Sequence, residues 1–356
     1  MKLLFLTQTL DAEDAVLGFT SRWVEGLAKH TQEVRAIALE VGCTDGLPEN
    51  VSWREVGRRG ALGRWLRYRG LLKEAFAEGF DTVLAHIVPR YASLAAGPAR
   101  KANARLFLWY THGAVDARLK KAVARVERVF TATEESLRLE TPKKVVTGHG
   151  VDMSHFDPRG EAPEEPPRVL AVGRISPAKD PLTLLAAISI LRSRGLEVHL
   201  DLVGAGLLES DDSLRRQVEE QVEFGGLAEC VCMPGAVAYP QVNAWYRRAT
   251  VVVNASGTGS LDKVVLEAMA SERPVLTSNP AAAGVLRELG AEGEALVFEQ
   301  GSAEDLAEKL EQLLGRSAEE RRQLGVRLRV IAERGHEVDA LMGRLVGMMG
   351  GEDGGA

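Results

Sequence analysis

The sequence predicts an α/β protein made of two doubly wound, Rossmann-like domains that face each other across a cleft. Its 356 residues exceed what one ordinary core accommodates and suit two α/β domains. Short apolar runs rich in leucine and β-branched residues alternate with amphipathic segments along most of the chain, which is the pattern of βαβ units and parallel sheets. The alternation stops at an acidic, proline-rich segment, residues 161–167, and starts again after it.

Five apolar segments in the first half of the chain have the length and composition of strands that are buried on both faces. These expected strands are Leu3–Thr7, Val34–Leu39, Thr82–Ile87, Arg105–Tyr110 and Val129–Thr131. The amphipathic segments between them have a helical period, and the clearest are Gly18–His30, Leu62–Glu78 and Tyr91–Lys101.

Residues 161–167 have nothing to pack and are expected to form a linker, so we place the domain boundary near residue 165. The first domain then covers 1–165 and the second covers 166–335, while 336–356 form a last segment with a frayed end. In the second domain the expected elements are Val169–Val172, Pro181–Arg194, Val198–Val203, Ser213–Phe224, Cys230–Met233, Pro240–Arg248, Val251–Asn254, Asp262–Ser271, Val275–Thr277 and Ala295–Phe298.

The composition argues against a membrane-spanning or disulfide-rich protein. No stretch approaches the roughly 20 consecutive apolar residues of a membrane span, and Met1–Leu6 lacks a signal cleavage site and is expected to be a first buried strand. The three cysteines, Cys43, Cys230 and Cys232, are too few for a disulfide framework and lack the partners of a zinc site. A reducing cytoplasm is the expected location.

The charge is uneven along the chain. Residues 1–160 carry 24 basic and 19 acidic side chains, whereas residues 161–356 carry 20 and 31, within a net charge of −6. This asymmetry suggests that the first domain meets an anionic partner.

The most informative segment runs from Ser256 to Ala270 and reads SGTGSLDKVVLEAMA. A strand ends before it, small residues form a loop, and a helix is expected from Asp262, whose carboxylate is placed to cap it. Free amides at a helix start attract phosphate. Glu267 follows among apolar neighbours, where a carboxylate needs hydrogen-bond donors, and a ribose diol supplies two. The alternative is a surface glutamate on an amphipathic helix.

A second segment, residues 171–180, reads AVGRISPAKD. A strand ends at Val172, Gly173 turns the chain, and Arg174 and Lys179 follow five residues apart. Two cations at the carboxyl end of a strand are able to clamp a diphosphate and neutralise charge as it leaves.

Together these segments resemble glycosyltransferase family 4, whose members have the two-domain GT-B fold. Residues 266–270, LEAMA, and Pro274-Val275 match the family signature, and the resemblance gives Glu267 the role of the second of two glutamates, on the ribose. The first glutamate falls on Gly259, so the chain resembles a variant that lacks it, with Asp262 as the substitute. The resemblance assigns donor binding to Gly259, Ser260, Leu261, Asp262, Lys263 and Val264.

In the second segment Arg174 and Lys179 match the family's diphosphate pair position by position, and the two segments together are the strongest part of the resemblance. Weaker matches surround them: the glycines Gly18, Gly173 and Gly204 stand where the family has glycine turns near the donor. His112 stands where a family histidine contacts the donor sugar, although a single histidine is as often structural. A last helix, His336–Met349, is expected to cross back to the first domain, as is usual in this fold.

A basic, aromatic stretch, Arg58–Lys73, includes Arg58, Arg59, Arg64, Trp65, Arg67, Tyr68 and Arg69. As a helix it has the composition to contact an anionic membrane. The alternative is an amphipathic helix that packs its apolar side on its own sheet. No recognised nucleic-acid-binding module accompanies the charge, so no nucleic-acid partner is expected.

The resemblance implies a retaining, metal-independent glycosyltransferase of the hexosyltransferase type. It would use a UDP-sugar or GDP-sugar, need no cofactor, and act on a glycan or lipid-linked acceptor. The expected location is the cytoplasm, either free or peripheral on the inner face of the membrane. Two alternatives stay open: a nucleotide-sugar epimerase-like enzyme, and a catalytically degenerate protein that binds nucleotide-sugars.

Overall fold

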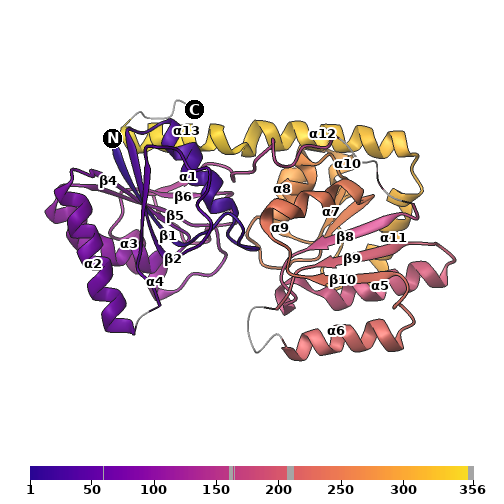
Figure 1. Ribbon diagram of the computed structural model, residues 1–356. Helices are drawn as coiled ribbons and strands as arrows, with labels where there is room; N and C mark the ends of the chain where they lie inside the picture. The colour runs from indigo at the N-terminus through magenta and orange to yellow at the C-terminus, as the bar shows by residue number, and fades with distance from the viewer. Residues whose placement is uncertain (59, 160–162, 164, 207–211, 352–356) are drawn as a thin grey trace. The chain divides into compact units, whose positions relative to one another are not determined.

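The computed structural model describes residues 1–58, 60–159, 163, 165–206 and 212–351. The chain forms two compact units (Figure 1). The first unit contains Met1–Asp152, Ala238–Pro240 and His336–Ala356, and the second contains Met153–Val237 and Gln241–Gly335.

The first unit is built on a seven-stranded parallel sheet with the order β3-β2-β1-β4-β5-β6-β7. Its strands are β1 (Lys2–Leu10), β2 (Glu33–Val41), β3 (Val51–Glu55), β4 (Thr82–His86), β5 (Arg105–Trp109), β6 (Val129–Thr131) and β7 (Lys144–Val146). The order reverses direction between β1 and β4, which is the switch point of a doubly wound sheet.

The helices of the first unit follow the strands as βαβ crossovers, with a last helix added from the end of the chain. They are α1 (Phe19–Lys29), α2 (Ala61–Ala77), α3 (Pro89–Lys101), α4 (Ala117–Val123) and α13 (Val338–Gly350). Helix α13 packs against α1, where Arg22 and Lys29 both contact the Asp339 carboxylate, at 2.7 and 2.8 Å. Gly26 allows this close approach, because a Cβ there would lie 2.6 Å from Cγ of Met342.

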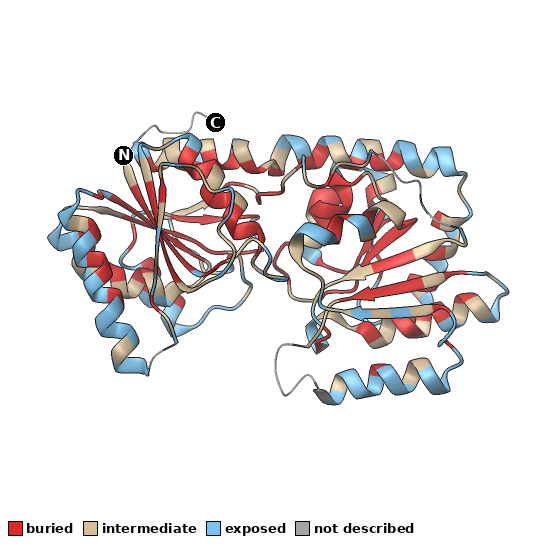
Figure 2. Cartoon of the chain, viewed as in Figure 1, coloured by how far each residue is buried: buried red, intermediate tan, exposed pale blue. Residues whose placement is uncertain are grey.

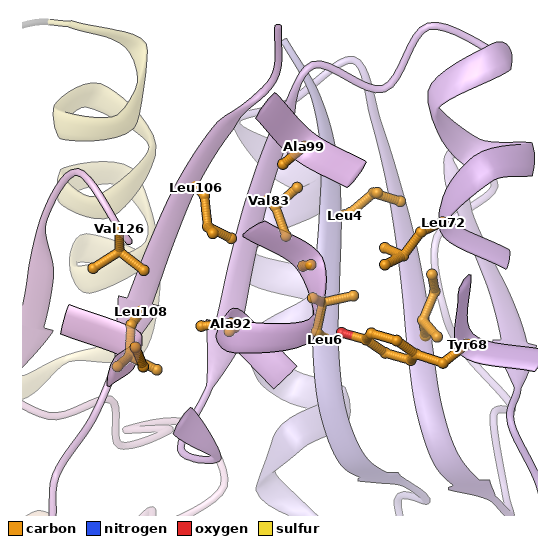
Figure 3. Close-up of a cluster of buried hydrophobic side chains, with 14 of the residues drawn as sticks. Leu4, Leu6, Tyr68, Leu72, Val83, Ala92, Ala99, Leu106, Leu108 and Val126 are labelled. Atoms are coloured by element: carbon orange, nitrogen blue, oxygen red, sulfur yellow. The ribbon is translucent and has the colours of Figure 1, made fainter. Parts of the chain in front are cut away.

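Figure 3 shows part of the first unit's core, where side chains of α2 and α3 cover the sheet. Tyr68 and Leu72 of α2 lie over Leu4 and Leu6 of β1, and the Tyr68 hydroxyl donates to the carbonyl of Tyr91 at 3.2 Å. The alternative interpretation of the Arg58–Lys73 stretch is therefore correct for one face of α2, which packs on its own sheet.

The second unit is built on a five-stranded parallel sheet with the order β10-β9-β8-β11-β12, so its switch point lies between β8 and β11. The strands are β8 (Arg168–Val172), β9 (His199–Val203), β10 (Val231–Gly235), β11 (Val251–Asn254) and β12 (Val275–Thr277). The helices are α5 (Pro181–Ser193), α6 (Asp212–Phe224), α7 (Val242–Arg248), α8 (Lys263–Ala270), α9 (Pro280–Leu286), α10 (Ala291–Glu294), α11 (Ala303–Leu314) and α12 (Ala318–His336). Single 3₁₀ turns are η1 (Pro177–Lys179), η3 (Tyr239–Gln241) and η4 (Arg287–Leu289).

The central strands of both sheets are almost continuously buried, whereas the outer faces of α2 and α6 are exposed (Figure 2). Two parallel-sheet α/β units confirm the predicted fold class. The sequence prediction missed β3 and β7, which are the two edges of the first sheet. Edge strands are partly exposed: in β3 only Val51 is buried, so this strand lacks the continuous apolar run of a central strand. The apolar segment 295–298 forms a single bridge, Val297 to Thr277.

Part of the predicted linker, the end of the predicted tail, and Arg59 lie outside the described residues.

Candidate active site

The carboxyl ends of β8, β9 and β11 meet at a small cavity in the second unit, next to the switch point of its sheet. The cavity encloses about 30 Å³, which is room for about one water molecule, and it is open on one side. Arg174 and Lys179 both line it, together with Gly173, Val203 and Asn254. The structure thus brings the two predicted cations to one place, where open α/β sheets bind their ligands.

Two glycines shape this cavity because their backbones touch. Gly173 and Gly204 have φ angles of 149° and 142°, which non-glycine residues rarely adopt. A Cβ on Gly204 would lie 1.9 Å from the carbonyl oxygen of Gly173. The N–H of Gly173 donates to the carbonyl of Val203 at 2.9 Å, which joins the two loops.

Lys179 lies at the end of the η1 turn, and its ammonium contacts Oδ2 of Asp262 at 2.8 Å. Burial acts to raise the pKa of the Asp262 carboxyl, but the charge and hydrogen bond of Lys179 outweigh it, so this pKa lies below its usual value. Asp262 stands at the N-cap position of α8, yet its carboxylate makes no capping bond. The predicted cap is therefore wrong, because the ion pair with Lys179 takes the carboxylate instead.

Arg174 contrasts with Lys179. Its side chain is exposed, and within the described parts of the chain no carboxylate or hydrogen-bond acceptor pairs with it. Among the described residues that line this cavity, Arg174 is thus the cation without a carboxylate partner.

The loop between β11 and α8 is held by buried polar side chains. The amide of Asn279 donates to the carbonyl of Ser260 at 2.8 Å, and the hydroxyls of Ser256 and Thr258 lie 3.2 Å apart. Gly259 has a φ of 74°, in the left-handed region. A glutamate at this position, where the resembled family has one, would be strained in this backbone. The loop conformation thus fits the glycine that the sequence has.

Glu267 lies inside α8 and is 6% exposed. Its carboxylate accepts a hydrogen bond of 2.8 Å from the hydroxyl of Tyr246, a donor that sequence reasoning did not identify. Burial raises the pKa of the Glu267 carboxyl, although the Lys263 charge and the Tyr246 bond act to lower it. Glu267 is buried rather than on an exposed helix face, and it is not one of the residues that line the cavity.

The remaining predicted site residues of α8 and its loop lie close to Asp262 in the chain. Ser260 and Leu261 are buried, 9% and 3% exposed, whereas Lys263 and Val264 are half-buried in the first turn of α8. Sequence reasoning did not identify Asn254 and Asn279 as site residues. Two signals were present: Asn254 is the last residue of an expected strand, and Asn279 stands directly before a proline, which is typical of a helix start.

Gly18 and His112 belong to the first unit. Gly18 precedes α1, and a Cβ there would lie 2.6 Å from the carbonyl oxygen of Asp14. His112 is exposed in the loop after β5, and its Nδ1 accepts a 3.0 Å hydrogen bond from the N–H of Ala114. Its Nε2 is then the nitrogen that remains for a ligand.

The first unit also has a large basic hollow of about 1390 Å³ between α2, α3 and the segment after α4. Its charged lining consists of one acidic residue, Glu127, and six basic residues, Arg69, Lys73, Arg100, Lys101, Arg105 and Arg125. Arg105 pairs with Glu127 at 2.8 Å. Beside the hollow, Leu62 and Leu66 of α2 are 69% and 57% exposed.

Among the described residues, no three His, Cys, Asp or Glu side chains are grouped as metal ligands, and no helix combines the length and hydropathy needed to cross a bilayer.

Part of the second unit is similar in sequence to glycosyltransferases. Residues 166–316, less than half of the chain, match the family model described as glycosyl transferases group 1. A D-inositol 3-phosphate glycosyltransferase of Paenarthrobacter aurescens is 31% identical over 173 residues, which are 46% of this chain and 41% of that relative. A mannosylfructose-phosphate synthase of Agrobacterium fabrum is 29% identical over 140 residues, 36% of this chain and 31% of that protein. The matches thus span less than half the length of these curated relatives.

Solved structures match over the whole chain. The Anabaena protein HepE in complex with UDP and glucose has a TM-score of 0.79 at 17% identity, covering 98% of this chain and 99% of that one. Sucrose-phosphate synthase from Thermosynechococcus elongatus has a TM-score of 0.74 at 17% identity, covering 99% and 100%. At this identity the likeness establishes the fold, which is GT-B.

Proposed function

We propose that the chain is a retaining glycosyltransferase of the hexosyltransferase type. It transfers a sugar from a nucleotide-diphosphate sugar, UDP- or GDP-linked, to a glycan or lipid-linked acceptor, without a metal ion or cofactor. One observation carries the proposal: Arg174 and Lys179 line the same cavity at the carboxyl end of β8. The family match of residues 166–316 includes both.

The proposed mechanism stabilises the leaving group by fixed charges. The bond between the anomeric carbon and the phosphate oxygen breaks, and negative charge collects on the departing nucleoside diphosphate. Arg174, Lys179 and the backbone amides at the start of α8 neutralise that charge. The acceptor hydroxyl attacks on the same face, forms the new glycosidic bond and passes its proton to the leaving phosphate oxygen.

Glu267 has a separate role in the proposal, on the ribose hydroxyls of the donor. Its buried carboxylate already accepts one hydrogen bond from Tyr246 and keeps further acceptor capacity for a diol. The roles of Gly18 and His112 near the donor stay predictions.

The experiment measures donor binding first and turnover second. A panel of UDP- and GDP-sugars is screened by thermal shift, because a ligand of the folded state raises its stability. Arg174→Ala and Lys179→Ala should each lower donor hydrolysis or transfer by at least about 100-fold, the scale of one lost electrostatic donor. Arg215→Ala is the matched control, since Arg215 is exposed on α6 and its ion-pair partner among the described residues is Glu219 of the same helix. Wild-type rates in both site variants would refute the assignment.

The same panel separates the two alternatives. An epimerase isomerises the donor without an acceptor, and a degenerate protein binds the donor without turning it over. Acceptors for the transfer assay begin with D-inositol 3-phosphate, because a matched relative is named for it.

The proposal includes a cytoplasmic location with peripheral contact to an anionic membrane through Arg58–Lys73, and no nucleic-acid partner. The exposed Leu62 and Leu66 beside the six basic residues of the hollow support membrane contact, because aliphatic and cationic side chains together suit a headgroup layer. The protein should sediment with phosphatidylglycerol vesicles and not with phosphatidylcholine vesicles, and a Leu62→Glu, Leu66→Glu double variant should lose this binding. Equal sedimentation with both lipids would contradict it.

A further inference from the structure

Asp262 is held in one orientation by the residues around it. Its Oδ2 accepts hydrogen bonds from the side-chain amides of Asn254, at 3.0 Å, and Asn279, at 3.4 Å. Both asparagines are buried, 3% and 0% exposed. The carboxylate is therefore fixed by groups from the ends of two neighbouring strands before Lys179 is considered.

The orientation of the two amides is itself determined. The amide oxygen of Asn254 accepts from the Thr277 hydroxyl at 2.9 Å, and that of Asn279 accepts from the N–H groups of Ala281 and Ala282. Because each oxygen is occupied, each NH₂ group faces the acceptor that is left, which is Asp262 or the Ser260 carbonyl.

Lys179 reaches this carboxylate along the mouth of the cavity. Its stem passes over Gly173, where a Cβ would lie 3.6 Å from Cε of Lys179. Its ammonium ends 2.8 Å from Asp262, with the side chains 22% and 14% exposed. A lysine has four rotatable bonds, so without this anchor the ammonium would sample much of the solvent around the cavity.

We propose that Asp262 is a positioning residue, which holds the Lys179 ammonium at the cavity so that its other donors point to the diphosphate of the donor. The proposal rests on the function proposed above. An ammonium has three N–H donors, and one suffices for Asp262. Lys179 therefore keeps two for phosphate oxygens while its position stays fixed.

This role differs from the one expected from the sequence, in which Asp262 replaces the missing first glutamate on the sugar hydroxyls. Lys179, Asn254 and Asn279 all contact the same oxygen of Asp262, Oδ2, so this oxygen has little capacity left for sugar hydroxyls. It also carries a negative charge close to the expected diphosphate. The negative charge of Asp262 thus repels the diphosphate, while its ion pair fixes the position of the Lys179 ammonium.

These opposing effects predict that a change at Asp262 lowers turnover without lowering nucleotide affinity, which a purely structural residue would not give. In Asp262→Asn, the affinity for UDP or GDP, whichever the wild type binds, should stay equal or rise by about 3-fold to 10-fold, because a nearby negative charge is gone. The turnover number should fall by at least about 10-fold, because Lys179 is no longer held. Asp262→Glu keeps the charge and should recover part of the turnover.

A double-mutant cycle with Lys179→Ala tests whether Asp262 acts through Lys179. Once Lys179 is absent, Asp262→Asn should lower turnover by less than 2-fold, because the two residues act as a unit. Asp180→Asn is the control: it removes the neighbouring carboxylate, which accepts from Thr183 at the start of α5. This control should leave nucleotide affinity and turnover unchanged.

Each outcome is decisive. If the wild type binds UDP or GDP and transfers sugar, but Asp262→Asn keeps full turnover or the two changes are additive, the positioning role is overturned and the proposed function stands. If Asp262→Asn loses affinity and turnover together with thermal stability, Asp262 is structural. If the wild type binds neither nucleotide, the proposed function is overturned and this inference falls with it.

Discussion

Replacing Gly204 by alanine tests the close contact of the two loops that form the cavity. The new Cβ would lie 1.9 Å from the carbonyl oxygen of Gly173, whereas real Cβ atoms keep at least 3.0 Å, so the loops must separate by about 1.1 Å. They resist, because the N–H of Gly204 donates to Gly235 and that of Gly173 donates to Val203, both at 2.9 Å. Forced overpacking of this kind costs about 1–3 kcal/mol.

Gly195→Ala is the matched control for the backbone strain. Gly195 also has a positive φ, 83°, but nothing lies within 4 Å of its Cβ position. Both variants therefore carry the strain of an alanine at positive φ, on the order of 1–3 kcal/mol, and only Gly204→Ala adds the collision. The excess of about 1–3 kcal/mol corresponds to a further fall in Tm of about 2–4 °C for each kcal/mol.

The assay is thermal and urea unfolding of both variants, followed by nucleotide binding. Gly204→Ala should unfold at a lower temperature than Gly195→Ala and bind UDP or GDP more weakly, since its cavity is distorted. Equal unfolding temperatures for the two variants would refute the close contact. Normal stability with lost binding would instead assign Gly204 directly to the ligand.

Three further predictions concern buried titratable side chains: Asp201, His336 and Glu267. Asp201 is fully buried and pairs with two arginines, so Asp201→Ala should lower the free energy of unfolding by about 3 kcal/mol in urea titrations, and Asp201→Asn by clearly less. Burial lowers the pKa of His336 from 6.5 to about 4, so between these pH values the imidazole is protonated in the unfolded state and neutral in the folded state. Stability should therefore fall as the pH drops from 6.5 to 4, by about 1.4 kcal/mol per pH unit, and His336→Gln should flatten that slope. Glu267 has a raised pKa, so its ionisation opposes folding at neutral pH: Glu267→Gln should raise Tm at pH 7 yet weaken nucleotide binding, and unchanged binding would contradict a role on the ribose.

The sequence alone was sufficient for the fold class. Central strands of a parallel sheet are buried on both faces, so their apolar runs are visible in the sequence alone, as in β1, β4 and β11. Edge strands lack this signal, which is why β3 and β7 were missed. Arg174 and Lys179 were found because a glycine and two cations follow a strand end directly.

The tertiary structure decided which side chains meet. The chain order places Asp262 at a helix start, and a cap is the expected local role; its partner Lys179 is more than 80 positions away, and the pairing depends on β8 and β11 lying side by side. The Tyr246 donor to Glu267 and the collision geometry of Gly204 with Gly173 also come from separate segments. Local sequence patterns predict the role of a residue within its own strand, loop or helix. Ion pairs and backbone contacts between distant segments depend instead on the order of the strands in the sheet.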